Sequence, residues 1–349
     1  MTKSLNVTAN IESLSPEGPL VALDEYGNKF QETSSTLQKL SPKTFNLTKC
    51  QVSLSVCELV NLIYKTMEEA CVSSEDFAEK LFHTVRNLLS MYWHIIPTAH
   101  SQTIANIPDH AALIHNNAVY LAHHAFLLGH HYKNRLPISS QTTTITAVDL
   151  GYMIRSTGCN VFLKSMLNHK NHLQDLIRKG VEAASLKWEE TSVNPLQMSV
   201  QNCLKHLTKL KNAWMKILPR SVYCKSIGTL AGSVVEDLVL RVVALEEIST
   251  DEAIALINIL SLLESNIPNL FSSDDEHVSQ AEALKEVRLW EKLKELIIVL
   301  GASLQDLNER WLGGKGPLAH NFTSDEVKHL IKAIFQNTER RAQLLAKIK

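Results

Sequence analysis

The sequence of 349 residues has little of what catalytic and secreted proteins usually display. Its six cysteines form no Cys-x-x-Cys pair, so neither a zinc knuckle nor a small disulfide scaffold is indicated. It has no dinucleotide-binding glycine motif, Walker loop or Gly-x-Ser-x-Gly elbow. Strand-like alternation is almost absent, and the only β-leaning run is Thr142 to Thr146. These absences favour an all-α, non-enzymatic protein with reduced, packed thiols, as is usual in the cytosol.

The chain also lacks a strong charge of one sign and a long apolar run. Its formal net charge is −1, which gives no basic footprint for nucleic acid or anionic lipid. No stretch approaches the roughly 18 apolar residues that span a bilayer, and the N-terminus has no apolar signal-peptide core. The most apolar run, Ala253 to Leu263, contains Asn258 and Ser261 and is interpreted as a buried helix.

What the sequence does contain is helical periodicity, which divides it into three parts. Residues 1–45 are rich in Ser, Thr, Asn, Pro and Gly and are predicted to be a disordered linker or tail. Residues 46–190 are predicted to form a first helical bundle and residues 191–349 a second, C-terminal one. After an amphipathic segment from Leu54 to Met67, we expect helices over 73–96, 108–135, 145–187 (interrupted near Gly151 or Gly158), 193–217, 220–247, 250–266, 284–311 and 324–347.

Several single residues mark where these helices start and pack. Ser249 with Glu252, and Thr323 with Glu326, have the spacing of capping boxes. Gly228 and Gly232 lie four residues apart inside a helix, which predicts the close approach of another helix backbone. Four tryptophans at apolar-neighbour positions are predicted to be packing anchors: Trp188, Trp214, Trp290 and Trp311.

Histidine is the most suggestive residue type, because eight of the fifteen histidines fall between residues 94 and 131. Pairs such as His115–His123 and His124–His131 are seven or eight residues apart, about 10–12 Å along a helix axis, too far to share an ion. We therefore expect His124 and His131 to line a seam between helices and to form local hydrogen bonds. His169 and His172 are one helical turn apart, but two ligands without a third make a weak site. The alternative left open is a helical-bundle metal- or haem-binding protein that uses the 94–131 histidines.

The C-terminal segment predicts an amphipathic helix whose apolar face packs within its own bundle. Its expected anchors are Trp311, Phe322, Ile331 and Phe335, after a turn built from Gly313, Gly314, Gly316 and Pro317. The opposite face carries Lys328, Lys332 and Arg340, which are the candidate partner contacts. No catalytic, cofactor-binding or metal-ligating residue is predicted.

The amino-acid sequence of several segments closely resembles that of the zeste-white ten family. The likeness runs from about Phe45 to Lys349 and is weak before Phe45. The segments that carry it include Trp311, Gly314-Lys315-Gly316-Pro317-Leu318-Ala319, Phe335-Gln336-Asn337-Thr338-Glu339-Arg340-Arg341-Ala342, His115-Asn116-Asn117, Tyr120-Leu121-Ala122-His123-His124, Tyr223-Cys224-Lys225 and Ala244-Leu245-Glu246-Glu247-Ile248-Ser249-Thr250.

The resemblance implies an elongated helical-bundle rod of the multisubunit tethering complex type and a scaffold role. Its complexes would serve the spindle checkpoint and dynein recruitment at kinetochores, and vesicle tethering between the Golgi and the endoplasmic reticulum. The implied partners are Rod and Zwilch, the neuroblastoma-amplified protein with SNARE-linked tether subunits, and dynein–dynactin indirectly. The implied locations are the cytoplasm, the periphery of the endoplasmic reticulum membrane, and the mitotic kinetochore and spindle. The family's N-terminal half has no counterpart in the sequence, so we expect Met1 to begin a fragment.

Overall fold

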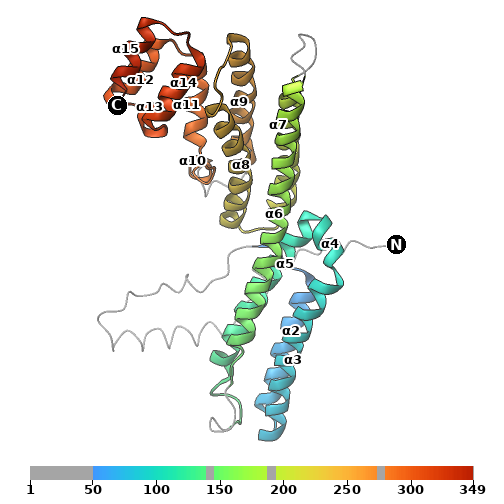
Figure 1. Ribbon diagram of the computed structural model, residues 1–349. Coiled ribbons are helices and arrows are strands. Elements are labelled where there is room, and N and C mark those ends of the chain that lie inside the picture. Colours follow the sequence, from blue (N-terminus) through green and yellow to red (C-terminus); the bar gives the residue numbers. More distant parts are fainter. Residues whose placement is uncertain (1–49, 139–144, 187–193, 273–279, 349) are drawn as a thin grey trace, which may run out of the picture. The chain divides into compact units, whose positions relative to one another are not determined.

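The structure is a computed structural model that describes residues 50–138, 145–186, 194–272 and 280–348. This described part consists of helices joined by turns and contains no strand, which confirms the all-α prediction (Figure 1). All six cysteines are free thiols. The prediction of packed cysteines holds for Cys57, Cys203 and Cys224, which are buried, while the other three are half-buried. The predicted tail over 1–45, Trp188, and residues 142–144 of the β-leaning run lie outside the described residues.

The described chain forms two compact units, whose division falls inside a helix. The first unit contains the residues up to Ser165 together with Ala213–Pro219. In it, α2 packs against both α3 and α5, and α4 packs against α5. Its helices are α2 (Leu54–Cys71), α3 (Glu75–Ala99), α4 (Ser101–Asn106), α5 (Pro108–Tyr132) and the first part of α6 (Val148–Leu186).

The second unit contains Met166–Asn212 and Arg220–Lys349. Within it, α11 packs against α8, α9 and α13, while α14 contacts α8 and α15. This unit also includes the rest of α6 and most of α7 (Pro195–Trp214), whose last two residues belong to the first unit. Its other helices are α8 (Arg220–Val243), α9 (Thr250–Leu270), α10 (Gln280–Leu284), α11 (Trp290–Gly301), α12 (Leu304–Trp311), the 3₁₀ turn η3 (Leu312–Gly314), α13 (Pro317–Asn321), α14 (Ser324–Ile334) and α15 (Glu339–Lys347).

Two expectations for the first unit are wrong. Helix α3 begins at Glu75 and continues through Pro97 to Ala99, whereas a helix over 73–96 was expected. Helix α6 runs without interruption through both of its early glycines. At Gly158 the reason is packing, since a Cβ there would lie 2.1 Å from the Cβ of Ala118 on α5. The glycine thus permits a close helix contact where the sequence suggested a break.

In the second unit, two predicted long helices are broken into shorter ones. The segment 284–311 begins at the last residue of α10 and contains a turn, α11 and α12. The helix is broken because Leu289 adopts a left-handed conformation (φ 59°) and Ser303 starts a new helix through a capping box with Asp306. The segment 324–347 is divided into α14 and α15, and Thr338 caps the second helix. The capping boxes predicted at Ser249 and Thr323 are confirmed.

The glycine pair of α8 marks a close approach, as predicted, but a turn makes the contact instead of a helix. A Cβ at Gly228 would lie 2.6 Å from the Cβ of Glu286, and one at Gly232 would lie 2.7 Å from the backbone nitrogen of Arg288. These residues belong to the turn between α10 and α11. Because they lack a Cβ, the two glycines allow the turn before α11 to pack directly against α8.

Helix α9 is more apolar than the sequence analysis expected. By length and composition alone it could cross a membrane, and it is the one such helix in the described part of the chain. In the structure, however, α9 packs against α8 and α11, and Ile259, Leu260 and Leu263 are buried. The prediction of a buried helix for residues 253–263 therefore holds for one face of α9, while Ile254 on the same segment is 53% exposed.

Candidate partner-binding face of the C-terminal bundle

The C-terminal elements are joined by an ion pair between α11 and α14. Lys292 Nζ lies 2.7 Å from Glu326 Oε1 and also 4.7 Å from the centre of the Phe322 ring. Glu326 additionally accepts a hydrogen bond from the backbone N–H of Thr323, so one carboxylate caps α14 and binds α11. Burial alone would raise the pKa of Glu326, but the ammonium of Lys292 and the Thr323 N–H outweigh it and hold the pKa below its usual value.

A second pair joins α11 to α12. The guanidinium of Arg310 donates to both carboxylate oxygens of Glu295, at 2.6 and 3.1 Å. Glu295 is buried, so this bidentate pair satisfies a charge that would otherwise be costly inside the bundle. The two pairs fix the register of α11 against α12 and α14.

The break between α14 and α15 is held by Arg341. Its Nη1 donates to the carbonyl oxygen of Phe335 at 2.6 Å, and Thr338 accepts from the backbone N–H of Arg341. This side chain satisfies a carbonyl that the end of α14 leaves open. Leu344 and Ile348 are buried, so the final helix closes onto the bundle.

Three of the four predicted anchors are confirmed: Trp311, Phe322 and Ile331 are buried. Phe335 is only half-buried, which contradicts its predicted role. The reason is the helix end at Ile334, after which Phe335 adopts an extended conformation (φ −108°, ψ 139°) and leaves the apolar face. The glycine turn is confirmed, with positive φ at Gly313 and Gly314.

The predicted contact residues lie on both sides of that break. Lys328 and Lys332 are one turn apart on α14, the first half-buried and the second exposed, while the exposed Arg340 lies in the first turn of α15. Within the described residues, no salt bridge joins any of these three side chains to a carboxylate.

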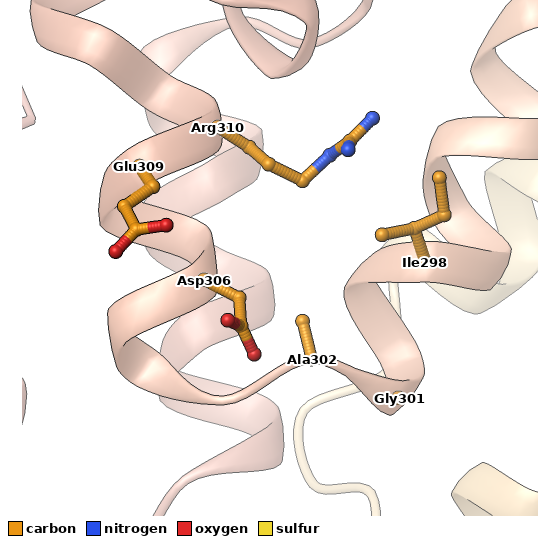
Figure 2. Close-up of a pocket in the computed structure, with 6 residues that line it drawn as sticks. All are labelled: Ile298, Gly301, Ala302, Asp306, Glu309 and Arg310. Carbon is orange, nitrogen blue, oxygen red and sulfur yellow. The ribbon is translucent and has the colours of Figure 1, made fainter.

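A shallow hollow lies between the end of α11 and α12 (Figure 2). Ile298, Gly301 and Ala302 line one side, and Asp306, Glu309 and Arg310 line the other. Arg310 is held by Glu295, and Asp306 accepts from the backbone N–H and hydroxyl of Ser303. Because these polar groups already have partners inside the protein, the hollow is part of the bundle's structure and does not assemble a nucleophile with a base.

The histidine-rich helix α5 turns out to line a seam with α2. Nδ1 of His124 lies 2.9 Å from the hydroxyl of Tyr64, and the rings of both His124 and His131 lie against Tyr64. Burial, with the neighbouring charges of His123 and His131, lowers the pKa of His124 to about 3. The predicted seam is therefore present, and its imidazoles are neutral at pH 7.

The predicted local hydrogen bonding of these histidines is wrong in two respects. His124 bonds across to α2 instead of locally, and both ring nitrogens of His131 are buried without a hydrogen-bond partner among the described residues. His94 does bond locally, to the carbonyl oxygen of Ser90 at 2.6 Å. Nδ1 of His115 lies 3.2 Å from Oδ1 of Asn116, and Nδ2 of Asn116 donates to the carbonyl oxygens of Gln51 and Ile217.

Comparison with known proteins gives two family matches along the chain. The family described as "Centromere/kinetochore protein zw10, C-terminal" matches residues 45–175, and the "ZW10 C-terminal helical domain" matches residues 198–348. The chain belongs to the zw10 family. The resemblance recognised in the sequence is thereby confirmed for both units.

Relatives in this family come from animals and plants. The rat "Centromere/kinetochore protein zw10 homolog" is 39% identical over 334 residues, covering 94% of this chain and 42% of that protein. The Drosophila melanogaster "Centromere/kinetochore protein zw10" is 29% identical over 308 residues, covering 87% and 39%. The Arabidopsis thaliana homolog is 24% identical over 319 residues, covering 87% and 41%. The chain thus spans about two fifths of the length of these zw10 proteins.

Sequence reasoning missed the charged residues that build the C-terminal bundle of this zw10-family chain. Lys292 and Glu326 are 34 residues apart, and nothing local links them. Arg310 and Glu295 are 15 residues apart on what was expected to be one helix, where they would not have met. The start of α12 could have been predicted from the sequence, because Ser303 and Asp306 have the Ser-x-x-acid spacing of a capping box.

Proposed function

We propose that this chain is the C-terminal part of a non-enzymatic scaffold subunit that works at the centromere and kinetochore. The observation that carries the proposal is membership of the zw10 family along both units, with relatives named as centromere and kinetochore proteins. The all-α architecture supports it, because helical bundles offer long faces for binding other helices.

The scaffold role extends to partners. The family resemblance supports docking of an α-solenoid partner, with Rod and Zwilch in a kinetochore complex that serves the spindle checkpoint and dynein recruitment. It also supports docking of the neuroblastoma-amplified protein in a tether between the Golgi and the endoplasmic reticulum. Our candidate docking surface consists of Lys328, Lys332 and Arg340, which form no salt bridge with a carboxylate of the described residues. This surface predicts an acidic patch on the partner.

The experiment is capture of Rod and of the neuroblastoma-amplified protein by the purified chain and by a variant with Lys328, Lys332 and Arg340 all changed to Glu. A matched control changes three exposed lysines of the first unit, Lys65, Lys80 and Lys164, to Glu. We expect wild type and control to capture both partners and the C-terminal variant to lose them. Failure of wild type to capture either partner contradicts the scaffold proposal, whereas equal capture by the C-terminal variant contradicts only the docking surface.

A further inference from the structure

Three histidines from two helices meet in the second unit. His169 and His172 lie on α6, and His206 lies on α7. Nε2 of His206 is 3.2 Å from Nδ1 of His169, and the two ring centres are 5.2 Å apart. The ring centre of His172 lies 4.8 Å from that of His206. The fold thus supplies the third histidine that the sequence pair lacked.

These spacings suit metal coordination. Imidazole nitrogens bind zinc at about 2.0–2.1 Å in tetrahedral sites, which places two neighbouring ligand nitrogens roughly 3.3–3.4 Å apart. The 3.2 Å separation between His169 and His206 is therefore close to that of two ligands on one ion. In the free protein the two nitrogens share one proton in a hydrogen bond, and the donor ring would take its other tautomer when an ion replaces that proton.

The chemical state of the rings also suits a metal, because a metal-binding imidazole has to be neutral. Burial, with the nearby charges of His169, His172 and Lys209, lowers the pKa of His206 to about 4. Burial likewise lowers the pKa of His169. Both rings are neutral at pH 7, so no proton has to be displaced from a charged imidazolium before an ion binds.

We propose that His169, His172 and His206 form a three-histidine site for a transition-metal ion, with Zn²⁺ as the preferred ion and water at the fourth position. Within the described residues, no three such ligands already surround one point, so binding requires the His172 ring to turn toward the other two. His172 is exposed, which leaves its ring room to do so.

Two residues near the three histidines, Cys203 and Lys209, affect what the site can bind. Cys203 lies one turn before His206 on α7, but its Sγ faces the carbonyl oxygen of Leu173, and burial raises the pKa of its thiol to about 12. It stays protonated and is not a fourth ligand. The exposed Lys209 carries a positive charge near the rings and opposes a cation, so its removal strengthens binding.

The test titrates the EDTA-treated full chain with Co²⁺, followed by absorbance, and with Zn²⁺, followed by calorimetry. We expect one equivalent per chain and the intense visible bands of tetrahedral Co²⁺. His206→Ala and His172→Ala should each weaken binding at least roughly tenfold, which is about 1.4 kcal/mol. Lys209→Gln should tighten it, and His94→Ala and His123→Ala should leave it unchanged.

Circular dichroism of the metal-free variants controls for folding, and the exposed His172 provides a test even if the His206 variant unfolds. No saturable binding by wild type overturns the site. Equal binding by the His172 variant overturns it as well. Loss of binding in the His123 variant alone would place the metal on α5 and would also overturn it.

Discussion

The α2–α5 seam of the first unit and the α11–α14 bundle of the second bury polar groups in different ways. The seam uses neutral rings, with Tyr64 between His124 and His131. The bundle uses charges, with Lys292 paired to Glu326 and Arg310 paired to Glu295. The hydrogen-bonded contact between His124 and Tyr64 is neutral and costs little to bury, while each charged pair depends on both of its members.

The difference sets how each region responds to acid. The pKa of His124 in the folded chain is depressed to about 3, so the unfolded state binds more protons once pH falls below about 6.5. The pKa of Glu326 is also depressed, but from a much lower ordinary value near 4.5. Both groups destabilise the fold on acidification. The seam should weaken between about pH 6.5 and 3, whereas the Lys292–Glu326 pair should hold until pH falls below about 4.5.

The largest effect should follow from breaking a charged pair in the bundle. Arg310→Ala leaves the buried carboxylate of Glu295 without its partner, which we expect to cost about 3–5 kcal/mol of unfolding free energy. The control is Arg178→Ala, whose partners Asp175 and Glu182 are exposed, and it should cost less than about 1 kcal/mol. Urea unfolding of both variants measures the difference. Equal costs would show that the pair does not depend on burial.

The second-largest effect should separate Ile331, which is a buried anchor of α14, from Phe335, which was predicted to be an anchor but is only half-buried. Ile331→Ala removes a fully buried side chain and should cost about 2–5 kcal/mol. Phe335→Ala removes a larger but half-buried ring beyond the helix end and should cost less than the isoleucine variant. Melting temperatures of the two variants give the order. A larger loss for the phenylalanine variant would contradict the assigned end of α14.

Local patterns predicted the elements of this fold better than they predicted its contacts. The capping boxes at Ser249 and Thr323 and the glycine turn before α13 are set by residues close in sequence, and they are where the sequence placed them. The breaks at Leu289 and Thr338 were missed, because apolar residues continue at helical spacing on both sides of them. Packing of the turn at Glu286 onto Gly228 decides the first break, and periodicity carries no information about it.

The candidate sites show the same limit. The sequence could predict that Lys328 and Lys332 lie on the same face of one helix, because residues four apart share a face. The meeting of His206 with His169 was not, because it depends on how α7 returns along α6. The sequence can therefore show two candidate ligands one turn apart on a helix, but a third ligand from another helix becomes visible only in the folded structure.

The acid response of the seam is the third test of the comparison. Between pH 7 and pH 5, protonation of His124 in the unfolded state should reduce stability by about 2 kcal/mol. Hydrogen exchange of the backbone amides of α2 and α5 at the two pH values measures this loss. His124→Gln keeps a group able to bond Tyr64 but cannot titrate, so most of the pH dependence should vanish. An unchanged pH dependence in that variant would assign the effect to other groups.

The smallest effect concerns the charged face opposite the apolar anchors. Reversing Lys332 and Arg340 to Glu should change stability by less than about 0.5 kcal/mol, since both side chains are exposed and unpaired among the described residues. The two changes also act in opposite directions. Lys332 lies in the last turn of α14, where a negative charge is unfavourable, while Arg340 lies in the first turn of α15, where a negative charge is favourable. The single variants should therefore shift the melting temperature slightly down and slightly up, respectively. Two single variants that both destabilise by more than about 1 kcal/mol would show that these cations belong to the bundle, and they would no longer serve as a docking surface.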